Sequence, residues 1–143
     1  MALERRAALA AVGSLLLGAC GFGRGSPGGS FPPEVGGTVT YRERFALPPD
    51  AELRVTLYET KGAGAEPTFI AEQIVPRPGQ VPLRFRVAFP PSVIDARAGY
   101  MLVARIEIGG RLAFVNERPV PVLTLGNPAM ADIVVSRATG ERR

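Results

Sequence analysis

The segment GYMLVARIEIGGRLAFV, residues 99–115, decides the fold. Residues 100–108 and 111–115 are strand-like runs, and they flank Gly109 and Gly110, the two-residue linker that a tight β-hairpin requires. Residues 101–106 carry apolar side chains on both faces, which is typical of a strand in the middle of a sheet. The segment therefore predicts a hairpin whose first strand is central.

Strand-like runs continue on both sides of this hairpin. Apolar and polar residues alternate with a two-residue period in residues 39–45, 53–58 and 83–89, and more weakly in residues 69–75; residues 120–125 and 131–135 complete the set. Prolines separate the runs and belong in loops or at strand ends, because proline cannot donate to a sheet ladder. At most a short helical turn is expected, at residues 92–98. Seven to eight strands predict an all-β fold, an antiparallel β-sandwich.

The first 19 residues have the order of a secretory signal peptide. Arg5 and Arg6 give a positive start, residues 7–17 are uncharged and mostly apolar, and small residues precede Cys20. The apolar stretch is far shorter than the roughly 20 residues that a membrane-spanning helix needs. A cleaved signal is therefore predicted rather than a transmembrane segment.

The sequence Leu17-Gly18-Ala19-Cys20 resembles the lipobox of bacterial lipoproteins. In such signals the cysteine thiol is coupled to diacylglycerol, the chain is cut before the cysteine, and the new amine is acylated. The resemblance implies that Cys20 anchors the protein to a membrane, because several acyl chains hold a protein firmly. The alternative is an ordinary signal peptide followed by a chance cysteine. As the sole cysteine, Cys20 allows neither an intramolecular disulfide nor a cysteine-based metal site.

One folded domain is expected after the signal. Removing the first 19 of 143 residues leaves 124, the size of a single domain. Residues 20–37, rich in Gly, Pro and Ser, predict a flexible tether behind the lipidated cysteine. Residues 38–137 are expected to form the β-sandwich, and residues 138–143 a frayed tail.

Composition excludes most catalytic and nucleic-acid functions. The formal net charge is +4, but the arginines are spread among acidic residues without a basic run, so we expect no nucleic-acid partner. The absence of histidine removes His-dependent triads, bases and zinc sites, and we expect no metal and no cofactor. Ser92 and Ser136 lack a nucleophile-elbow context, and no Gly-rich run opens a helix as a phosphate loop would.

Paired carboxylates remain the one catalytic alternative, since two acids can hydrolyse a glycoside. The candidates are Asp50, Glu52, Glu59, Asp95 and Glu107. Most occupy turn positions or the polar face of a strand, so we interpret them as solvated groups and expect no catalytic residue and no enzyme activity.

Surface recognition is the remaining kind of chemistry. Sheet edges are templates for strand addition by a peptide. Tyr58, Phe69, Tyr100 and Phe114 could anchor a partner if they were exposed, although aromatic residues of a sandwich this size mostly belong to the core. The sequence does not identify the binding residues.

Seven segments together resemble the YbaY/YscW-like lipoproteins. These are GTVTYRER (37–44), ALPPDA (46–51), LRVTL (53–57), IAEQ (70–73), GQVPL (79–83), YMLVARI (100–106) and GRLAF (110–114). The resemblance extends from about residue 37 to residue 135 and keeps the order and spacing of the family. Residues 58–62, YETKG, depart from it, because the family more often has an Asp-rich segment there.

The resemblance implies a small β-sandwich lipoprotein of the Gram-negative envelope. YscW-like members act as pilotins, which bind a secretin subunit and help it to assemble in the outer membrane, whereas many relatives have no settled role. Gly21 after the cysteine, in place of Asp, is what outer-membrane sorting implies. We therefore expect a non-catalytic, pilotin-like outer-membrane lipoprotein that faces the periplasm and binds or chaperones an envelope protein such as a secretin subunit.

A binding module for a small ligand or a glycan is the alternative function, beside a structural lipoprotein of unsettled role. An aromatic-lined pocket would favour the binding module, whereas an exposed apolar strand edge would favour the capture of a peptide.

Overall fold

A computed structural model describes residues 31–139 of the chain. The predicted signal peptide, Cys20 with its lipobox, and most of the predicted tether lie outside these residues, as do residues 140–143. The predictions made for those segments stay predictions.

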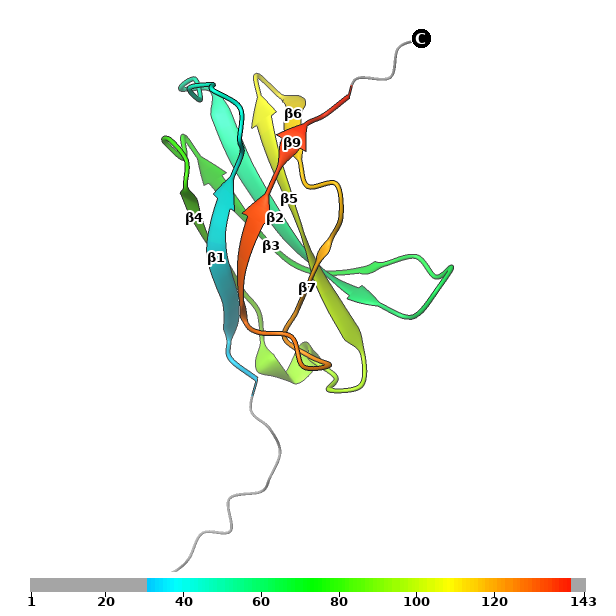
Figure 1. The fold of residues 1–143 in the computed structure, drawn as a ribbon. Coiled ribbons are helices and arrows are strands. Elements are labelled where there is room, and N and C mark those ends of the chain that lie inside the picture. The colour runs from blue at the N-terminus through cyan, green and yellow to red at the C-terminus, as the bar shows by residue number, and fades with distance from the viewer. Residues whose placement is uncertain (1–30, 140–143) are drawn as a thin grey trace, which may run out of the picture.

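Two β-sheets face each other as a sandwich (Figure 1). The smaller sheet has the strand order β4-β1-β8, and the larger has the order β3-β2-β5-β6-β9 with β7 also paired to β5. The strands are β1 (Glu34–Thr40), β2 (Ala51–Thr60), β3 (Thr68–Pro76), β4 (Leu83–Ala88), β5 (Gly99–Ile108), β6 (Arg111–Val115), β7 (Val120–Val122), β8 (Met130–Val134) and β9 (Ser136–Arg137). The predicted all-β sandwich is confirmed. Within residues 31–139, no helix has the length and apolar character needed to span a membrane.

Strand β5 is the central strand of the larger sheet, as the sequence predicts. It pairs with β2 along its whole length, from Ala51 opposite Ile108 to Thr60 opposite Gly99, and with β6 and β7 on its other side. Gly109 and Gly110 have φ values of 58° and 77°, the positive values that a tight hairpin turn needs at both central positions. The predicted hairpin is therefore confirmed.

Alternating side chains from both sheets form the core. The fully buried members are large apolar residues of seven different strands and include Val35, Val39, Leu53, Val55, Leu57, Leu83, Val87, Leu102, Ile106, Phe114, Val122 and Ile133. Burying one such side chain stabilises the fold by about 1.5–3 kcal/mol, so this single layer holds the two sheets together.

The first strand lies earlier in the sequence than the pattern predicts. It begins at Glu34 and not at residue 38, because Val35 is fully buried and pairs with Val87 of β4. The last residues assigned to the tether thus belong to the sheet. The strand also ends at Thr40, so residues 42–45 are not part of it.

The pairing of β1 with β8 is parallel, whereas an entirely antiparallel sandwich was predicted. The chain then passes directly from β8 in the smaller sheet to β9, which pairs with β6 in the larger sheet. The backbone N–H of Ala138 donates to the carbonyl of Ala113 at 2.9 Å, so the predicted frayed tail does not start at residue 138.

Two shorter differences concern loops. β7 ends at Val122 and does not extend to residue 125, because Leu123 and Leu125 adopt left-handed backbone conformations with φ values of 71° and 57°. The helical turn expected at residues 92–98 is a 3₁₀ turn, η1 (Pro91–Val93).

Substitution of Gly37 tests the close approach of β1 to β8. A Cβ atom on Gly37 would lie 1.7 Å from the carbonyl oxygen of Ala131, and the φ of Gly37 is +151°. We expect Gly37→Ala to lower the free energy of unfolding by at least about 3 kcal/mol, measured by urea denaturation of protein lacking residues 1–20. Gly110→Ala is the matched control, since Gly110 also has positive φ but no atom near its Cβ position; it should cost about 1–2 kcal/mol. Equal losses in both variants would contradict the steric explanation.

The hydroxyl of Tyr41 gives the fold an alkaline limit. Tyr41 is buried, stacks on Phe114 with ring centroids 4.7 Å apart, and donates its hydroxyl to the carbonyl of Phe45. Burial, and secondly the charge of Glu43, raise the pKa of Tyr41. The folded state therefore retains this proton more tightly than the unfolded state, whose tyrosine pKa is about 10. The stabilisation is complete below that value and is lost as the pH rises through the higher folded pKa.

We expect Tyr41→Phe to remove part of this alkaline loss while costing about 1 kcal/mol at neutral pH through the lost hydrogen bond. Denaturation of both proteins at pH 8 to 11 measures the effect. A constant difference between the two proteins over that range would contradict it.

Candidate functional site

Strand β8 has one unpaired edge. The N–H of Gly36 donates to the carbonyl of Ala129 at 3.1 Å, and the N–H of Val135 donates to the carbonyl of Thr40 at 2.8 Å. In a strand, alternate residues direct their backbone groups to opposite sides, so residues 129, 131, 133 and 135 face β1. The backbone groups of Met130, Asp132 and Val134 consequently face away from it, and within residues 31–139 no strand pairs with that side.

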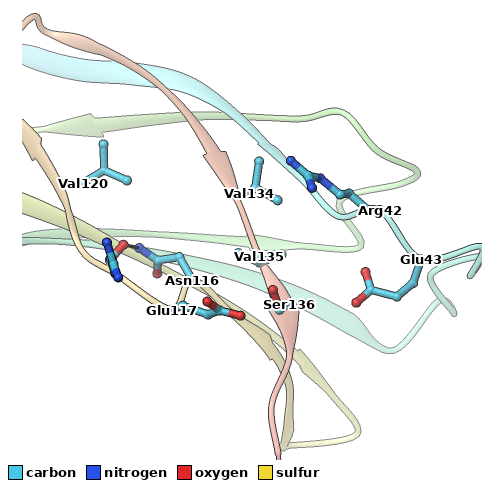
Figure 2. A pocket seen from close by; sticks show the side chains of 9 residues that line it. Arg42, Glu43, Asn116, Glu117, Val120, Val134, Val135 and Ser136 are labelled. Atoms are coloured by element: carbon cyan, nitrogen blue, oxygen red, sulfur yellow. Dashed lines mark hydrogen bonds between the residues drawn. The ribbon is translucent and has the colours of Figure 1, made fainter.

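A hollow of about 400 Å³ adjoins this edge, and we call it the edge hollow. It is lined by Arg42, Glu43, Asn116, Glu117, Arg118, Val120, Val134, Val135 and Ser136. Figure 2 shows the segment with Val134 and Ser136 crossing between Arg42 and Glu43 on one side and Asn116 and Glu117 on the other. The hollow thus combines apolar valines with charged groups at its rim, and no aromatic residue lines it.

Asn116 builds the wall of the edge hollow. At this point β6 leaves β5 and β7 has not yet joined it, so the backbone of β5 lacks a strand partner on the side opposite β2. The buried Asn116 supplies the missing bonds: its Oδ1 accepts from the N–H of Ala104 at 2.9 Å, and its Nδ2 donates to the carbonyl of Leu102 at 3.3 Å. The same Nδ2 donates to the carbonyl of Arg118 at 2.7 Å, which fixes the loop that forms the rim.

Glu43 brings an unsatisfied acceptor to the same place. Its Oε2 atom is buried and makes no hydrogen bond with any described residue. Buried polar atoms of folded proteins nearly always have a partner. An N–H or O–H donor of a bound molecule in the edge hollow would satisfy this oxygen.

The outer face of the smaller sheet carries a second depression, which we call the outer groove. It has a volume of about 630 Å³, and its lining includes Gly36, Thr38, Arg84, Met130 and Asp132. Gly36 of β1 has no side chain, so the groove is deeper at this position between β4 and β8. Thr38 donates to Oδ1 of Asp132 at 2.7 Å across the floor of the groove. The only aromatic residue of the lining, Phe85, is buried and directed to the core.

Two of the carboxylates singled out in the sequence lie together around an arginine. Glu52 and Glu107 lie opposite each other on β2 and β5, and both face Arg54, at 3.3 and 4.0 Å. Glu72, on the neighbouring β3, pairs with the same guanidinium at 3.0 Å. These acids are therefore held by an arginine on the outer face of the larger sheet. The prediction that Glu52 and Glu107 are freely solvated is wrong.

The other candidates are spread over the molecule. Asp95 accepts from the backbone N–H of Arg97 at 2.9 Å; this bond, more than the nearby Arg97 charge, lowers the pKa of Asp95. Asp50 is exposed beside the Gly109 turn, and Glu59 lies near the end of β2. Within residues 31–139, no three His, Cys, Asp or Glu side chains are grouped as metal ligands.

The four aromatic candidates divide into two groups. Tyr100 and Phe114 are buried, which confirms their interpretation as core residues. Phe69 is 58% exposed, so that interpretation is wrong for Phe69; it meets the half-buried Tyr58 edge-on, with ring centroids 6.5 Å apart. Neither ring lines the edge hollow or the outer groove.

The sequence did not predict the edge hollow. Ser136 lies in its lining, but the sequence drew attention to this residue only as a candidate nucleophile. Its lining residues come from three separate segments of the chain, and β8 is an edge strand only because of the order in which the strands assemble. The polar sequence NERP between two strand-like runs was the only local signal, and it reads as an ordinary loop.

Comparisons with known proteins agree on one family. Residues 32–135 match the family model described as type III secretion system lipoprotein chaperone (YscW). The chain is 37% identical over 95 residues to the uncharacterized lipoprotein YbaY of Escherichia coli strain K12; this match covers 66% of the chain and 50% of that relative, so it spans half of the relative's length. The solved structure of an alternative pilotin from the type II secretion system of Vibrio cholerae is also similar, with a TM-score of 0.70 and 34% identity, covering 75% of this chain and 97% of that one. These matches confirm the resemblance seen in the sequence.

Removal of the Asn116 side chain tests how the wall of the hollow is built. Asn116→Ala would leave buried backbone groups of β5 without partners, and each such group costs about 1–3 kcal/mol. We expect the free energy of unfolding to fall by about 2–4 kcal/mol in urea denaturation. Glu117→Ala, at the exposed neighbouring position, should change it by less than about 0.5 kcal/mol. Similar losses in the two variants would show that Asn116 does not organise this wall.

Proposed function

We propose, since this chain belongs to the family of type III secretion system lipoprotein chaperones (YscW), that it is a pilotin-like lipoprotein which captures a segment of another envelope protein. The structural likeness to a type II secretion pilotin supports this proposal, because it covers nearly the whole of that protein. The family is described as lipoprotein chaperones, and this description supports a role in binding another protein.

The unpaired edge of β8 is the observation that carries the mechanism. An extended peptide lying along this edge would pair its backbone with the free N–H and C=O groups of Met130, Asp132 and Val134. Successive side chains of a strand point to opposite faces, so a peptide side chain placed beside Val134 would enter the edge hollow. Val120 and Val134 favour apolar side chains there, and Oε2 of Glu43 would accept a hydrogen bond from a peptide donor.

A secretin-type subunit is the partner that we propose. The matching family model is named for a type III secretion system, and the similar solved structure for a type II secretion system. The anchor would be acylated Cys20 behind the lipobox Leu17-Gly18-Ala19, and Gly21 would direct the lipoprotein to the outer membrane, facing the periplasm. Anchoring and capture together would carry the partner to the membrane in which it assembles.

The lining of the two depressions favours a peptide over a glycan. Sugar rings are commonly bound by exposed aromatic faces, yet the edge hollow has no aromatic residue and the outer groove has only the buried Phe85. The strand edge, in contrast, offers the backbone groups that recognise an extended chain regardless of its sequence.

Proline at position 134 tests peptide capture. The N–H of Val134 faces the free edge, so Val134→Pro removes one donor from that edge and leaves the bonds between β8 and β1 in place. We expect crosslinking pull-down of the acylated protein from its own envelope, read by mass spectrometry, to recover at least about tenfold less partner with Val134→Pro than with wild type, a loss of about 1.4 kcal/mol.

Two matched variants complete this experiment. Val134→Ala shortens the side chain but keeps the N–H, and should retain recovery within about threefold of wild type, a change of less than about 0.7 kcal/mol. Cys20→Ser removes the acylation site and should lose recovery of an outer-membrane subunit. Unchanged recovery with Val134→Pro would exclude the β8 edge, and a co-purified glycan or lipid without any protein partner would favour the binding-module alternative.

A further inference from the structure

One end of the sandwich is apolar and nearly uncharged. This end, which we call the anchor-side pole, comprises residues 31–33, 90–98 and 123–130. Figure 1 shows the start of β1, the η1 turn and the loop before β8 at this same end. Its surface presents Val93, Leu125 and Met130, with 43%, 68% and 65% of each residue exposed. Asp95 and Arg97 are the only charged residues of the three segments, and they pair with each other at 3.5 Å.

The opposite pole has a different character. It comprises residues 41–50, 77–82, 109–111 and 136–139, at the other ends of the same strands. It carries five arginines against two acidic residues, and these are Arg42, Arg44, Arg77, Arg111 and Arg137 against Glu43 and Asp50. Apolar exposure and charge are thus separated along the long axis of the domain.

The loop that presents Leu125 is fixed in an unfavourable conformation. A φ of 57° is a left-handed conformation, which a bulky residue such as leucine rarely adopts. Hydrogen bonds hold the loop in place: Oγ1 of Thr124 donates to the carbonyl of Ala98 at 2.5 Å, and Nδ2 of Asn127 donates to the carbonyl of Thr124 at 2.9 Å. The fold thereby keeps a large apolar side chain in contact with solvent, although glycine would suit this backbone better.

We propose that the anchor-side pole docks onto the lipid bilayer, with Leu125, Val93 and Met130 inserted at the boundary between headgroups and acyl chains. This inference rests on the acylation of Cys20 proposed above. Only ten residues separate Cys20 from Phe31, and the eleven steps between them, at about 3.6 Å each at most, limit the reach to about 40 Å. Because the chain enters the domain at this pole, the anchor keeps the apolar pole next to the bilayer, while the arginine-rich pole and its strand ends face away from it.

Two exposed alanines offer matched reporter positions. Ala96 lies on the anchor-side pole and Ala46 on the opposite pole, and both are exposed loop residues. In the acylated protein the only native cysteine is blocked, so Ala96→Cys and Ala46→Cys each provide one thiol for an environment-sensitive fluorophore. The full acylated chain is reconstituted into vesicles of phosphatidylethanolamine and phosphatidylglycerol that contain spin-labelled lipids as quenchers.

Docking predicts that the label at position 96 is quenched at least threefold more than the label at position 46. Adding Leu125→Ser and Val93→Ser to the Ala96→Cys protein should reduce that quenching by at least half. Leu125→Gly, which relieves the left-handed strain, should maintain or raise the melting temperature while it also lowers the quenching, and this separates docking from folding. Equal quenching at both positions, or no response to these substitutions, would overturn the proposal.

A second arm separates this proposal from the proposed function. The intact mass of the purified protein reports whether Cys20 is acylated. Independently, Cys20→Ser protein with an N-terminal hexahistidine tag can be held on vesicles that contain nickel-chelating lipid. Preferential quenching at position 96 in this arm would support docking even if acylation or partner capture failed. Equal quenching at positions 96 and 46 would refute docking and would leave the proposed acylation and the proposed partner capture unaffected.

Discussion

One layer of interdigitating apolar side chains between a six-stranded and a three-stranded sheet is the interaction on which the rest of the structure depends. β2 and β5 supply one side of the layer and β1 and β4 the other, each through every second residue. The sheets differ in strand number, so they cannot cover each other completely. β8 therefore ends the smaller sheet with an unpaired side, and the edge hollow lies where the larger sheet turns from β6 to β7.

The fold was largely readable from local sequence because its strongest elements are regular. Strict alternation in residues 53–58 and 83–89, and a Gly-Gly linker between two apolar runs, correspond to β2, β4 and the β5–β6 hairpin. The start of β1 was not predicted, because Gly36 and Gly37 give no alternation signal. Glycine is required at position 37 because β8 lies so close to it. The parallel pairing of β1 with β8 was not predicted either, because side chains alternate with a two-residue period in parallel and antiparallel strands alike.

The candidate site was not readable in the same way. Glu43, Asn116 and Val134 are far apart in sequence, and each is unremarkable in its own segment. Asn116 is informative only when β5 is known to lack a strand partner at Ala104 on the side opposite β2. Glu52 and Glu107 show the opposite case, because the sequence drew attention to them as candidate catalytic residues. The register between β2 and β5 places both beside Arg54, where they have a structural role. The signal peptide and Cys20 were argued from sequence alone and stay predictions.

The parallel pairing of β1 with β8 has a mechanical consequence. The chain leads toward its N-terminus from the start of β1, so a force applied through that segment pulls β1 along its own axis. A force that pulls β8 toward the opposite pole acts along the same axis in the other direction, because the two strands are parallel. The hydrogen bonds between the two strands would then bear the force together, in shear, and would not open one after another like a zipper. β8 continues into β9, which is bonded to β6, so part of the load also passes into the larger sheet. The domain is thus built to transmit tension between its two ends without unravelling from its first strand.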